Sequence, residues 1–158
     1  MLLELRGISK SFPGVKALDN INLKLEKGEI HALLGENGAG KSTLMKIMCG
    51  VYSNDEGKII VNDEEKVFTN YNDGIEAGIG IIFQEFSLIP YLNTYENIFL
   101  NREPRTKYGL IDFAKMRKET QALLDRLEIS IDINVPVNTL SVAEQQFIEI
   151  SKALSLKA

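Results

Sequence analysis

The sequence predicts an α/β fold whose core is built around a glycine-rich turn between a strand and a helix. Three observations predict it. Apolar and polar residues alternate along much of residues 2–26, as they do in half-buried strands. An apolar run at residues 30–34 precedes the glycine-rich stretch 35–43, and apolar residues at helical spacing follow it. Helical periodicity dominates from about residue 85 to residue 137, which predicts a mostly helical insertion into the core.

Length and composition are those of a soluble domain. The 158 residues leave room for one domain with a sizeable core, and 44% of them are hydrophobic. The formal net charge of −4 argues against a general affinity for nucleic acid. Cys49 is the only cysteine, which excludes an internal disulfide and fits a reducing compartment. Because there is no bilayer-spanning apolar run and no secretion signal, we expect a soluble intracellular protein that works at a membrane only through a partner.

Antiparallel strands are predicted ahead of the glycine-rich stretch. Residues 2–9 and 15–26 alternate as half-buried strands do, and the turn signal at residues 11–14 separates them. A second turn at residues 27–28 leads into the run 30–34, which we expect to be a buried strand. A simple doubly wound fold begins with its phosphate loop, so this order predicts an additional antiparallel part.

The glycine-rich stretch matches the phosphate-binding pattern G-x-x-x-x-G-K-[ST]. Its residues are Gly35, Glu36, Asn37, Gly38, Ala39, Gly40, Lys41, Ser42 and Thr43. The glycines allow the backbone to approach a polyphosphate, whose charge is attracted by the free amides and dipole of the following helix. Lys41 supplies a mobile charge for the terminal phosphates, and the Ser42 hydroxyl is suited to ligating Mg²⁺. The alternative is a turn that merely joins strand to helix, but the fixed lysine and hydroxyl favour phosphate binding.

The segment after this loop begins with a helix. Leu44, Ile47 and Met48 are apolar at helical spacing, and Gly50 is a typical residue for ending a helix. The small Cys49 is expected to be a buried apolar residue of this helix.

A hairpin and a further strand are predicted next. Turn residues separate two short strands at 58–61 and 66–68, and a short helix follows at 72–77. Residues 78–83 then form an apolar run that predicts a buried strand ending at Gln84. Polar residues at the end of buried strands are where ligands collect in open α/β sheets, so Gln84 is a candidate site residue.

The chain beyond Gln84 is different in character. The loop 85–92 is rich in large apolar side chains, which either cover the core or meet another protein. A short helix follows at 94–100, with Asn93 and Glu96 spaced as a capping pair, and a longer amphipathic helix begins at Asp112.

Two candidate binding residues each have two interpretations. Phe12, in the first turn, either stacks on a purine ring or packs on its own strand, and the residues alone favour packing. After an extended stretch at 129–137, Ser141 and Glu144 form a capping-box pattern at the start of the last helix. That helix start is either a simple cap or a second anion site, and the pattern alone favours the cap.

Taken together, these features resemble the ATP-binding subunits of ABC transporters along the whole chain. The resemblance implies a P-loop NTPase core with an antiparallel β subdomain and a helical insertion subdomain, and it implies ATP and Mg²⁺ as ligands. Residues 35–43 would be the Walker A loop, with Lys41 as a catalytic group. Phe12 would stack on adenine, and Gln84 would join Mg²⁺ and the attacking water. Ser141 lies in the signature motif, which in the family closes over the γ-phosphate bound to the opposite subunit.

The signature motif also resembles a subgroup. Val142 and Ala143 replace its two glycines and Glu144 replaces its glutamine, which is similar to the importers of ribose, galactose and xylose. Residues 8–18 also resemble that subgroup, in which two ATP-binding domains are fused and such a start is the first of them. The implied partners are a membrane permease at the loop after Gln84, a second ATP-binding domain, fused or dimeric, and indirectly a periplasmic or extracellular sugar-binding protein. No nucleic acid is expected, and the implied location is the inner face of the cell membrane, on the cytoplasmic side.

The end of the chain departs from the family pattern. Residue 158 precedes the family's next core strand, so the Walker B acidic pair and the later switch histidine have no counterpart. His31 comes before the phosphate loop and is expected simply to occupy a strand. We therefore expect a truncated ABC-type ATP-binding domain, with a core at about 1–84 and a helical subdomain at about 85–158. Alone it should bind nucleotide weakly and release little phosphate from ATP.

Two other functional classes share some of these motifs. A soluble ABC-type ATPase acting on ribosomes or DNA shares the motifs, but the acidic net charge and the subgroup resemblance argue against it. A small-molecule kinase shares the phosphate loop, but the strands before the loop and the start of the Ser141 helix argue against that class.

Overall fold

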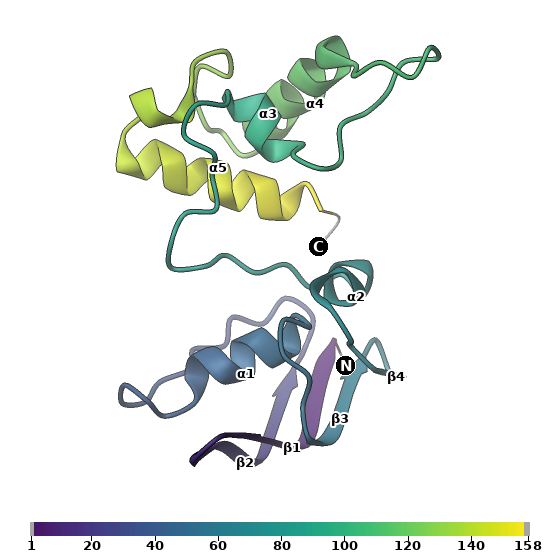
Figure 1. Ribbon diagram of the computed structural model, residues 1–158, viewed down its shortest axis with the longest axis vertical. Helices are drawn as coiled ribbons and strands as arrows, with labels where there is room; N and C mark the ends of the chain where they lie inside the picture. The colour runs from purple at the N-terminus through teal and green to yellow at the C-terminus, as the bar shows by residue number, and fades with distance from the viewer. Residues whose placement is uncertain (1, 157–158) are drawn as a thin grey trace. The chain divides into compact units, whose positions relative to one another are not determined.

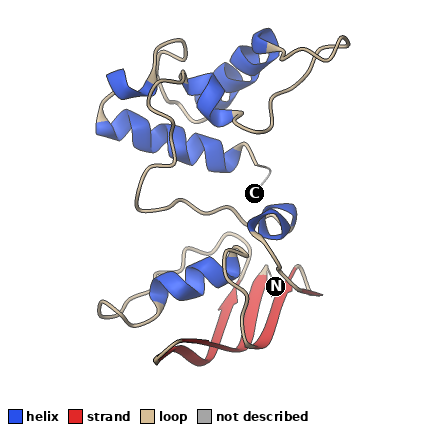
Figure 2. Cartoon of the chain, viewed as in Figure 1, coloured by secondary structure: helices blue, strands red, loops and turns tan. Residues whose placement is uncertain are grey.

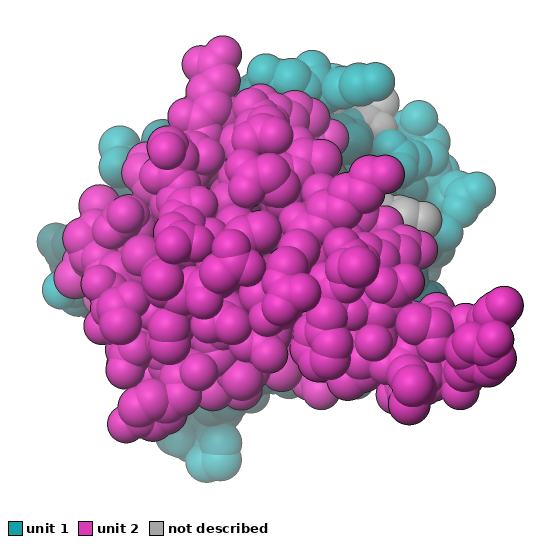
Figure 3. All heavy atoms as spheres, turned by 90° about the horizontal axis from the view of Figure 1, so that it is seen from above, with its two compact units in different colours: residues 1–81 teal, residues 82–158 magenta. Residues whose placement is uncertain are grey.

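The computed structural model describes residues 2–156, and the chain divides into two compact units, residues 1–81 and 82–158 (Figure 3). The division lies near the boundary expected at residues 84 and 85. The described strands all belong to the first unit, and the second unit is helical (Figure 2). No helix within the described residues is both long and apolar enough to cross a membrane.

The first unit contains a four-stranded antiparallel sheet in the order β2-β1-β3-β4 (Figure 1). β1 (Leu3–Phe12) and β2 (Val15–Leu25) form the predicted first hairpin, which closes where Phe12 pairs with Val15. β1 extends three residues beyond its predicted end, so Phe12 is the last residue of a strand rather than part of an open turn.

The second predicted hairpin is confirmed, with a shift in its second strand. β3 (Glu56–Val61) pairs with β1 and with β4 (Glu64–Lys66). Asn62 and Asp63 both have positive φ, as a two-residue hairpin turn requires, so pairing resumes at once and β4 begins two residues earlier than predicted. Phe68 is consequently released from the strand and is buried in the core.

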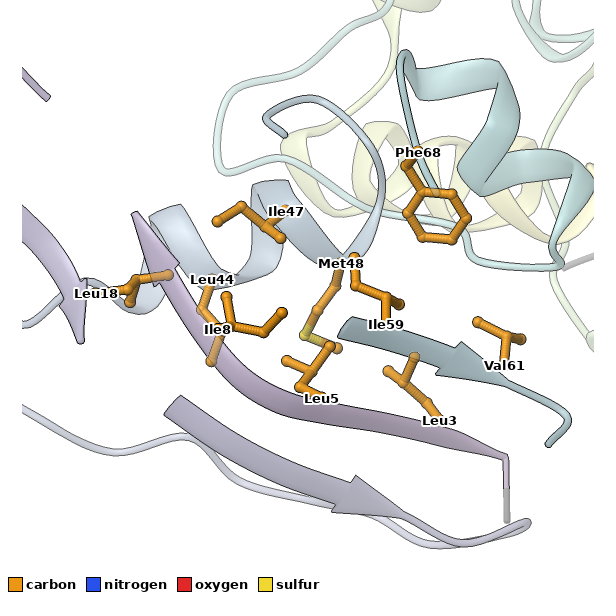
Figure 4. Packing of buried hydrophobic residues seen from close by; sticks show 10 residues of the cluster. All are labelled: Leu3, Leu5, Ile8, Leu18, Leu44, Ile47, Met48, Ile59, Val61 and Phe68. Atoms are coloured by element: carbon orange, nitrogen blue, oxygen red, sulfur yellow. The ribbon is translucent and has the colours of Figure 1, made fainter. Parts of the chain in front are cut away.

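The core of the first unit lies between this sheet and α1 (Lys41–Met48), the helix after the glycine-rich stretch. Figure 4 shows its side chains directed toward one another from the strands, from α1 and from Phe68. The buried cluster is Leu3, Leu5, Ile8, Leu18, Leu44, Ile47, Met48, Ile59, Val61 and Phe68. Gly50 ends the helix with φ of 79°, as predicted, and burial raises the pKa of the Cys49 thiol.

The prediction of two buried strands, one directly before the glycine-rich stretch and one after the second hairpin, is wrong. Residues 30–34 and 78–83 are loops, and Ile30 and Leu34 are 99% and 89% exposed. A buried strand needs hydrogen-bonding neighbours, and within residues 2–156 neither segment pairs with any of the four strands. The expectation that His31 occupies a strand is therefore also wrong; its Nδ1 lies 3.0 Å from Glu29 Oε1.

The helices were predicted more accurately than the strands. α2 (Tyr71–Glu76) closes the first unit, and α3 (Thr94–Ile98), α4 (Phe113–Arg126) and α5 (Val142–Leu154) form the second, with a short 3₁₀ turn at Val137–Thr139. The core of the second unit is Tyr95, Ile98, Met116, Leu124, Ile131, Ile133, Val137 and Ile148.

The predicted helix starts agree with the structure. Asn93 and Glu96 form a capping box at α3, and the Asp112 carboxylate accepts a hydrogen bond from the Lys115 amide at the start of α4. These caps satisfy backbone donors that have no partner within the helix, so the local sequence fixes where each helix begins.

Glu4 is a buried carboxylate on the face of β1 opposite to Leu3 and Leu5. It is only 3% exposed, and its carboxylate accepts a hydrogen bond from Arg6 at 2.6 Å and lies 3.1 Å from the ammonium of Lys24, its cross-strand neighbour. The Arg6 hydrogen bond, helped by Lys24, lowers the pKa of Glu4 to about 2. The ion pair between Glu4 and Lys24 therefore links β1 to β2.

We expect Glu4→Gln to lower the free energy of unfolding at pH 7, and the difference from the parent to shrink as the solution is acidified. Folding lowers the pKa of this carboxyl from 4.5 to about 2, so the ionised group stabilises the fold at pH values above 4.5. This contribution is lost as the pH falls toward 2. Urea unfolding at pH 7 and pH 3, followed by circular dichroism, measures the difference in unfolding free energy between the variant and the parent.

Glu64→Gln is the matched control, because the Glu64 carboxylate pairs with Lys66 at 2.6 Å but is largely exposed. It should have little effect at either pH. An equal loss in both variants, or a Glu4→Gln difference that does not change with pH, would contradict the assignment.

Candidate functional site

The N-terminus of α1 has no side-chain cap within residues 2–156. Gly40 is its N-cap residue. Within the described part of the chain, the amides of Lys41, Ser42 and Thr43 donate no hydrogen bond. Free amides at the positive end of a helix dipole attract anions, so this turn has the donors that the sequence pattern predicts.

Two glycines of the phosphate loop (residues 35–43) have backbone conformations that favour glycine. Gly38 and Gly40 have φ of 88° and 81°. A Cβ on Gly40 would lie 2.4 Å from the carbonyl oxygen of Ala17 and 2.8 Å from Leu18 Cδ2, whereas a Cβ on Gly38 would meet nothing within 4 Å. Gly40 therefore lets the loop pack directly on β2. Gly38 is needed only for its positive φ, because the space beside it is empty.

Lys41 holds the loop by its side chain. Its ammonium donates hydrogen bonds to the carbonyl oxygens of Gly35 at 2.7 Å and Glu36 at 2.6 Å. The Ala39 amide donates to the Glu36 carbonyl at 3.2 Å and closes a turn, and the side chain of Asn37 is exposed. An anion at the helix start would compete with these carbonyls for the ammonium, which is the strongest local donor.

The two hydroxyl residues after Lys41 differ in burial. Ser42 is exposed in the first turn of α1, and Thr43 is half-buried. A hydroxyl at this position can reach a hydrated cation beside a bound phosphate, which is the role predicted for Ser42.

Phe12 packs within its own unit. Its ring meets the ring of Tyr52 edge-on, with centroids 5.4 Å apart, and the ammonium of Lys10 lies 5.7 Å from its centroid. The ring remains half-buried rather than fully covered. These contacts agree with the packing interpretation, and stacking on a base stays a prediction.

Gln84 belongs to the second unit. Its side chain is exposed and lines a hollow of about 380 Å³ together with Phe83, Phe86 and residues of α5. The phosphate loop belongs to the first unit, so the predicted meeting of Gln84 and Lys41 around one ligand stays a prediction.

The loop of residues 85–92, which we call the apolar loop, is exposed but well anchored. Asn97, on α3, accepts a hydrogen bond from the Ile89 amide at 2.7 Å and donates to the carbonyl oxygens of Ile89 and Leu92 at 3.1 Å each. Phe86 and Tyr91 are exposed, Tyr91 by 81%. Sequence reasoning missed Asn97, because no local pattern within Thr94–Ile98 marks this polar residue as buried.

Ser141 is engaged by its own helix. Its amide and hydroxyl donate to Glu144 Oε2 at 2.8 and 2.6 Å, and the Glu144 amide donates back to the hydroxyl at 3.3 Å. These hydrogen bonds lower the pKa of Glu144. These contacts agree with the capping interpretation, and a second anion site at this helix start stays a prediction.

Comparison with known proteins identifies a family along most of the chain. The model of the ABC transporter family matches residues 18–158. A ribose import ATP-binding protein of Hahella chejuensis is 59% identical over 157 residues, which are 99% of this chain and 31% of the relative. A putative ribose/galactose/methyl galactoside import ATP-binding protein of Burkholderia cenocepacia is 51% identical over 154 residues, 98% of this chain and 29% of the relative. The chain thus spans less than a third of the length of these curated relatives.

Solved structures agree on the fold. A dimeric bacterial ABC transporter cassette is similar with a TM-score of 0.77 and 26% identity, over 98% of this chain and 70% of its own. A nucleotide-free ATP-binding cassette from an ABC transporter gives a TM-score of 0.83 at 24% identity, over 98% of this chain and 65% of its own. These similarities confirm the predicted fold class, a P-loop NTPase core with antiparallel β and helical subdomains.

Gly38 and Gly40 offer a matched pair of substitutions. Gly38→Ala should cost about 1–2 kcal/mol of unfolding free energy, because a Cβ is strained at positive φ even in open space. Gly40→Ala should cost about 3 kcal/mol or more, since strain adds to a clash with the β2 backbone. Urea unfolding followed by circular dichroism measures both, and equal losses would contradict the close approach of Gly40 to β2.

Proposed function

The chain belongs to the ABC transporter family, as the sequence resemblance predicts, and from this we propose that it is the ATP-binding part of an importer for a monosaccharide. The observation that carries the proposal is the 59% identity to a ribose import ATP-binding protein across 99% of the chain. ATP binding and hydrolysis would then be coupled to solute uptake through a membrane permease.

ATP is the proposed nucleotide, with its phosphates at the start of α1. The uncapped amides of Lys41, Ser42 and Thr43 and the Lys41 ammonium support this assignment. Together they provide fixed dipoles and a mobile cation on one turn, which suits a polyphosphate better than a single small anion. Phe12 is proposed to stack on the adenine, a role for which its half-buried ring would have to be approached from its open side.

Mg²⁺ is proposed to accompany the ATP. Ser42 would ligate it, and the remaining ligands would be phosphate oxygens and waters, because the described residues contain no cluster of three or more His, Cys, Asp or Glu side chains that could hold a metal. Such an ion neutralises charge on the transferring phosphoryl group. Gln84 is proposed to join Mg²⁺ and orient the attacking water, and Ser141 to face the γ-phosphate on an opposite subunit.

The permease is the proposed partner of the apolar loop. An anchored backbone with exposed Phe86 and Tyr91 suits protein recognition, since little ordering is needed on binding and aromatic side chains dominate interface energies. A second ATP-binding domain, fused or dimeric, and a sugar-binding protein outside the membrane complete the proposed assembly, on the cytoplasmic face of the cell membrane.

Lys41→Ala should weaken ATP binding by about tenfold or more, because it removes a charge-assisted hydrogen bond to phosphate. Titration of the chain with a fluorescent ATP analogue in the presence of Mg²⁺ measures the affinity. Lys27→Ala is the control, since it removes an equal charge from an exposed turn of the same unit. If both variants bind as the parent does, the phosphate site is misassigned.

Tyr91→Ser should weaken permease binding by about tenfold, the usual effect of truncating an aromatic residue in an interface centre. Tyr108→Ser is matched to it, because Tyr108 is 78% exposed in the same unit but lies outside the apolar loop. Binding of the purified variants to permease in detergent compares them. Equal weakening, or none, would exclude the apolar loop as the docking surface.

A further inference from the structure

Glu149 is a buried carboxylate that the proposed chemistry does not use. It lies on α5 and is 7% exposed. The Ser87 amide donates to its Oε1, and the Ser87 hydroxyl donates to its Oε2 at 3.1 Å. One turn further along α5, the Lys152 ammonium donates to the Ser87 hydroxyl oxygen at 3.2 Å. Polar contacts from Glu149 and Lys152 therefore fasten Ser87 of the apolar loop to α5.

Within the described residues, no group of α5 itself donates a hydrogen bond to the carboxylate of Glu149. Its neighbours Ile148 and Ile150 are apolar, and burying a carboxylate is costly unless hydrogen bonds compensate. The compensation comes from a residue 62 positions away in the sequence. The carboxylate thus connects two distant segments of the chain rather than stabilising its own helix.

The apolar loop is consequently anchored at two points. Ser87 is held on α5 by Glu149, and Ile89 and Leu92 are held on α3 by Asn97. The exposed side chain of Phe86 lies next to the first anchor. When a loop fixed in this way is displaced, α5 moves with it, whereas a loop without these hydrogen bonds would move alone.

We propose that Glu149 is a positioning residue that links the apolar loop to α5, so that docking of the permease on the loop is passed to the helix that begins at Ser141. This inference rests on the proposed function, which makes the loop the permease surface. Gln84 lines the same hollow as Glu149, so the link also includes the residue proposed to orient water.

The first experiment measures hydrogen exchange in the chain itself. Glu149→Leu replaces the carboxylate with an apolar side chain of similar size, which removes the acceptor, and should speed exchange of the 85–92 segment by about tenfold or more. Glu149→Gln keeps a carbonyl oxygen that can accept the Ser87 amide, and should stay within about threefold of the parent. Glu119→Gln, on the exposed face of α4, is the control and should change nothing.

Segment-specific exchange separates positioning from general stability. Exchange in α4 should stay as in the parent when residues 85–92 accelerate. If Glu149→Leu leaves the loop unchanged, or if the loop and α4 accelerate together, the inference is wrong.

The second experiment uses the full-length protein assembled with its permease in lipid vesicles. Glu149→Leu should lower the ratio of permease-stimulated to unstimulated ATP hydrolysis by about threefold or more, and Glu149→Gln should largely restore it. A merely structural role would lower both rates and leave the ratio unchanged, which would overturn the inference.

The two experiments also separate this inference from the proposed function. If the parent protein neither binds nor hydrolyses ATP, the proposed function fails, and the role of Glu149 in the importer fails with it. The hydrogen-exchange result then still decides whether Glu149 positions the loop on α5.

Discussion

The phosphate loop depends on one steric constraint, the approach of its backbone to β2 at Gly40. A Cβ there would lie 2.4 Å from the Ala17 carbonyl oxygen, so the loop can pack on the sheet only because this residue has no side chain. The contact lies at the N-cap of α1, whose first amides have no hydrogen-bond partner among the described residues. The proposed anion site would therefore be a consequence of how the helix is joined to the sheet, and the Lys41 ammonium lies at the same turn.

The second unit depends on buried polar contacts as well as on its apolar core. Asn97 and Glu149 are both buried, and both use their side chains to hold the backbone of the apolar loop. Hydrogen bonds are directional, so they fix the position of a loop more narrowly than apolar packing does. The loop can then expose large aromatic side chains and remain ordered, which is what a docking surface for another protein needs.

Local patterns predicted the helices and hairpins because each depends on nearby residues. The capping boxes at Asn93 and Ser141 are satisfied within one helical turn, and the Asn62–Asp63 turn fixes the register of β4. The predicted strands at 30–34 and 78–83 failed for the opposite reason. Their apolar runs are genuine, but a buried strand is stabilised by neighbours distant in sequence, and the described residues provide none for these segments.

The sequence by itself determined the phosphate-binding pattern, the helix starts and the family, because each is encoded in residue types at short fixed spacings. Only the tertiary structure decided that Phe12 packs on Tyr52 and that Asn97 and Glu149 hold the apolar loop. These contacts bring together residues from different segments of the chain. The sequence does not distinguish a polar side chain that is buried against a partner from one that faces water.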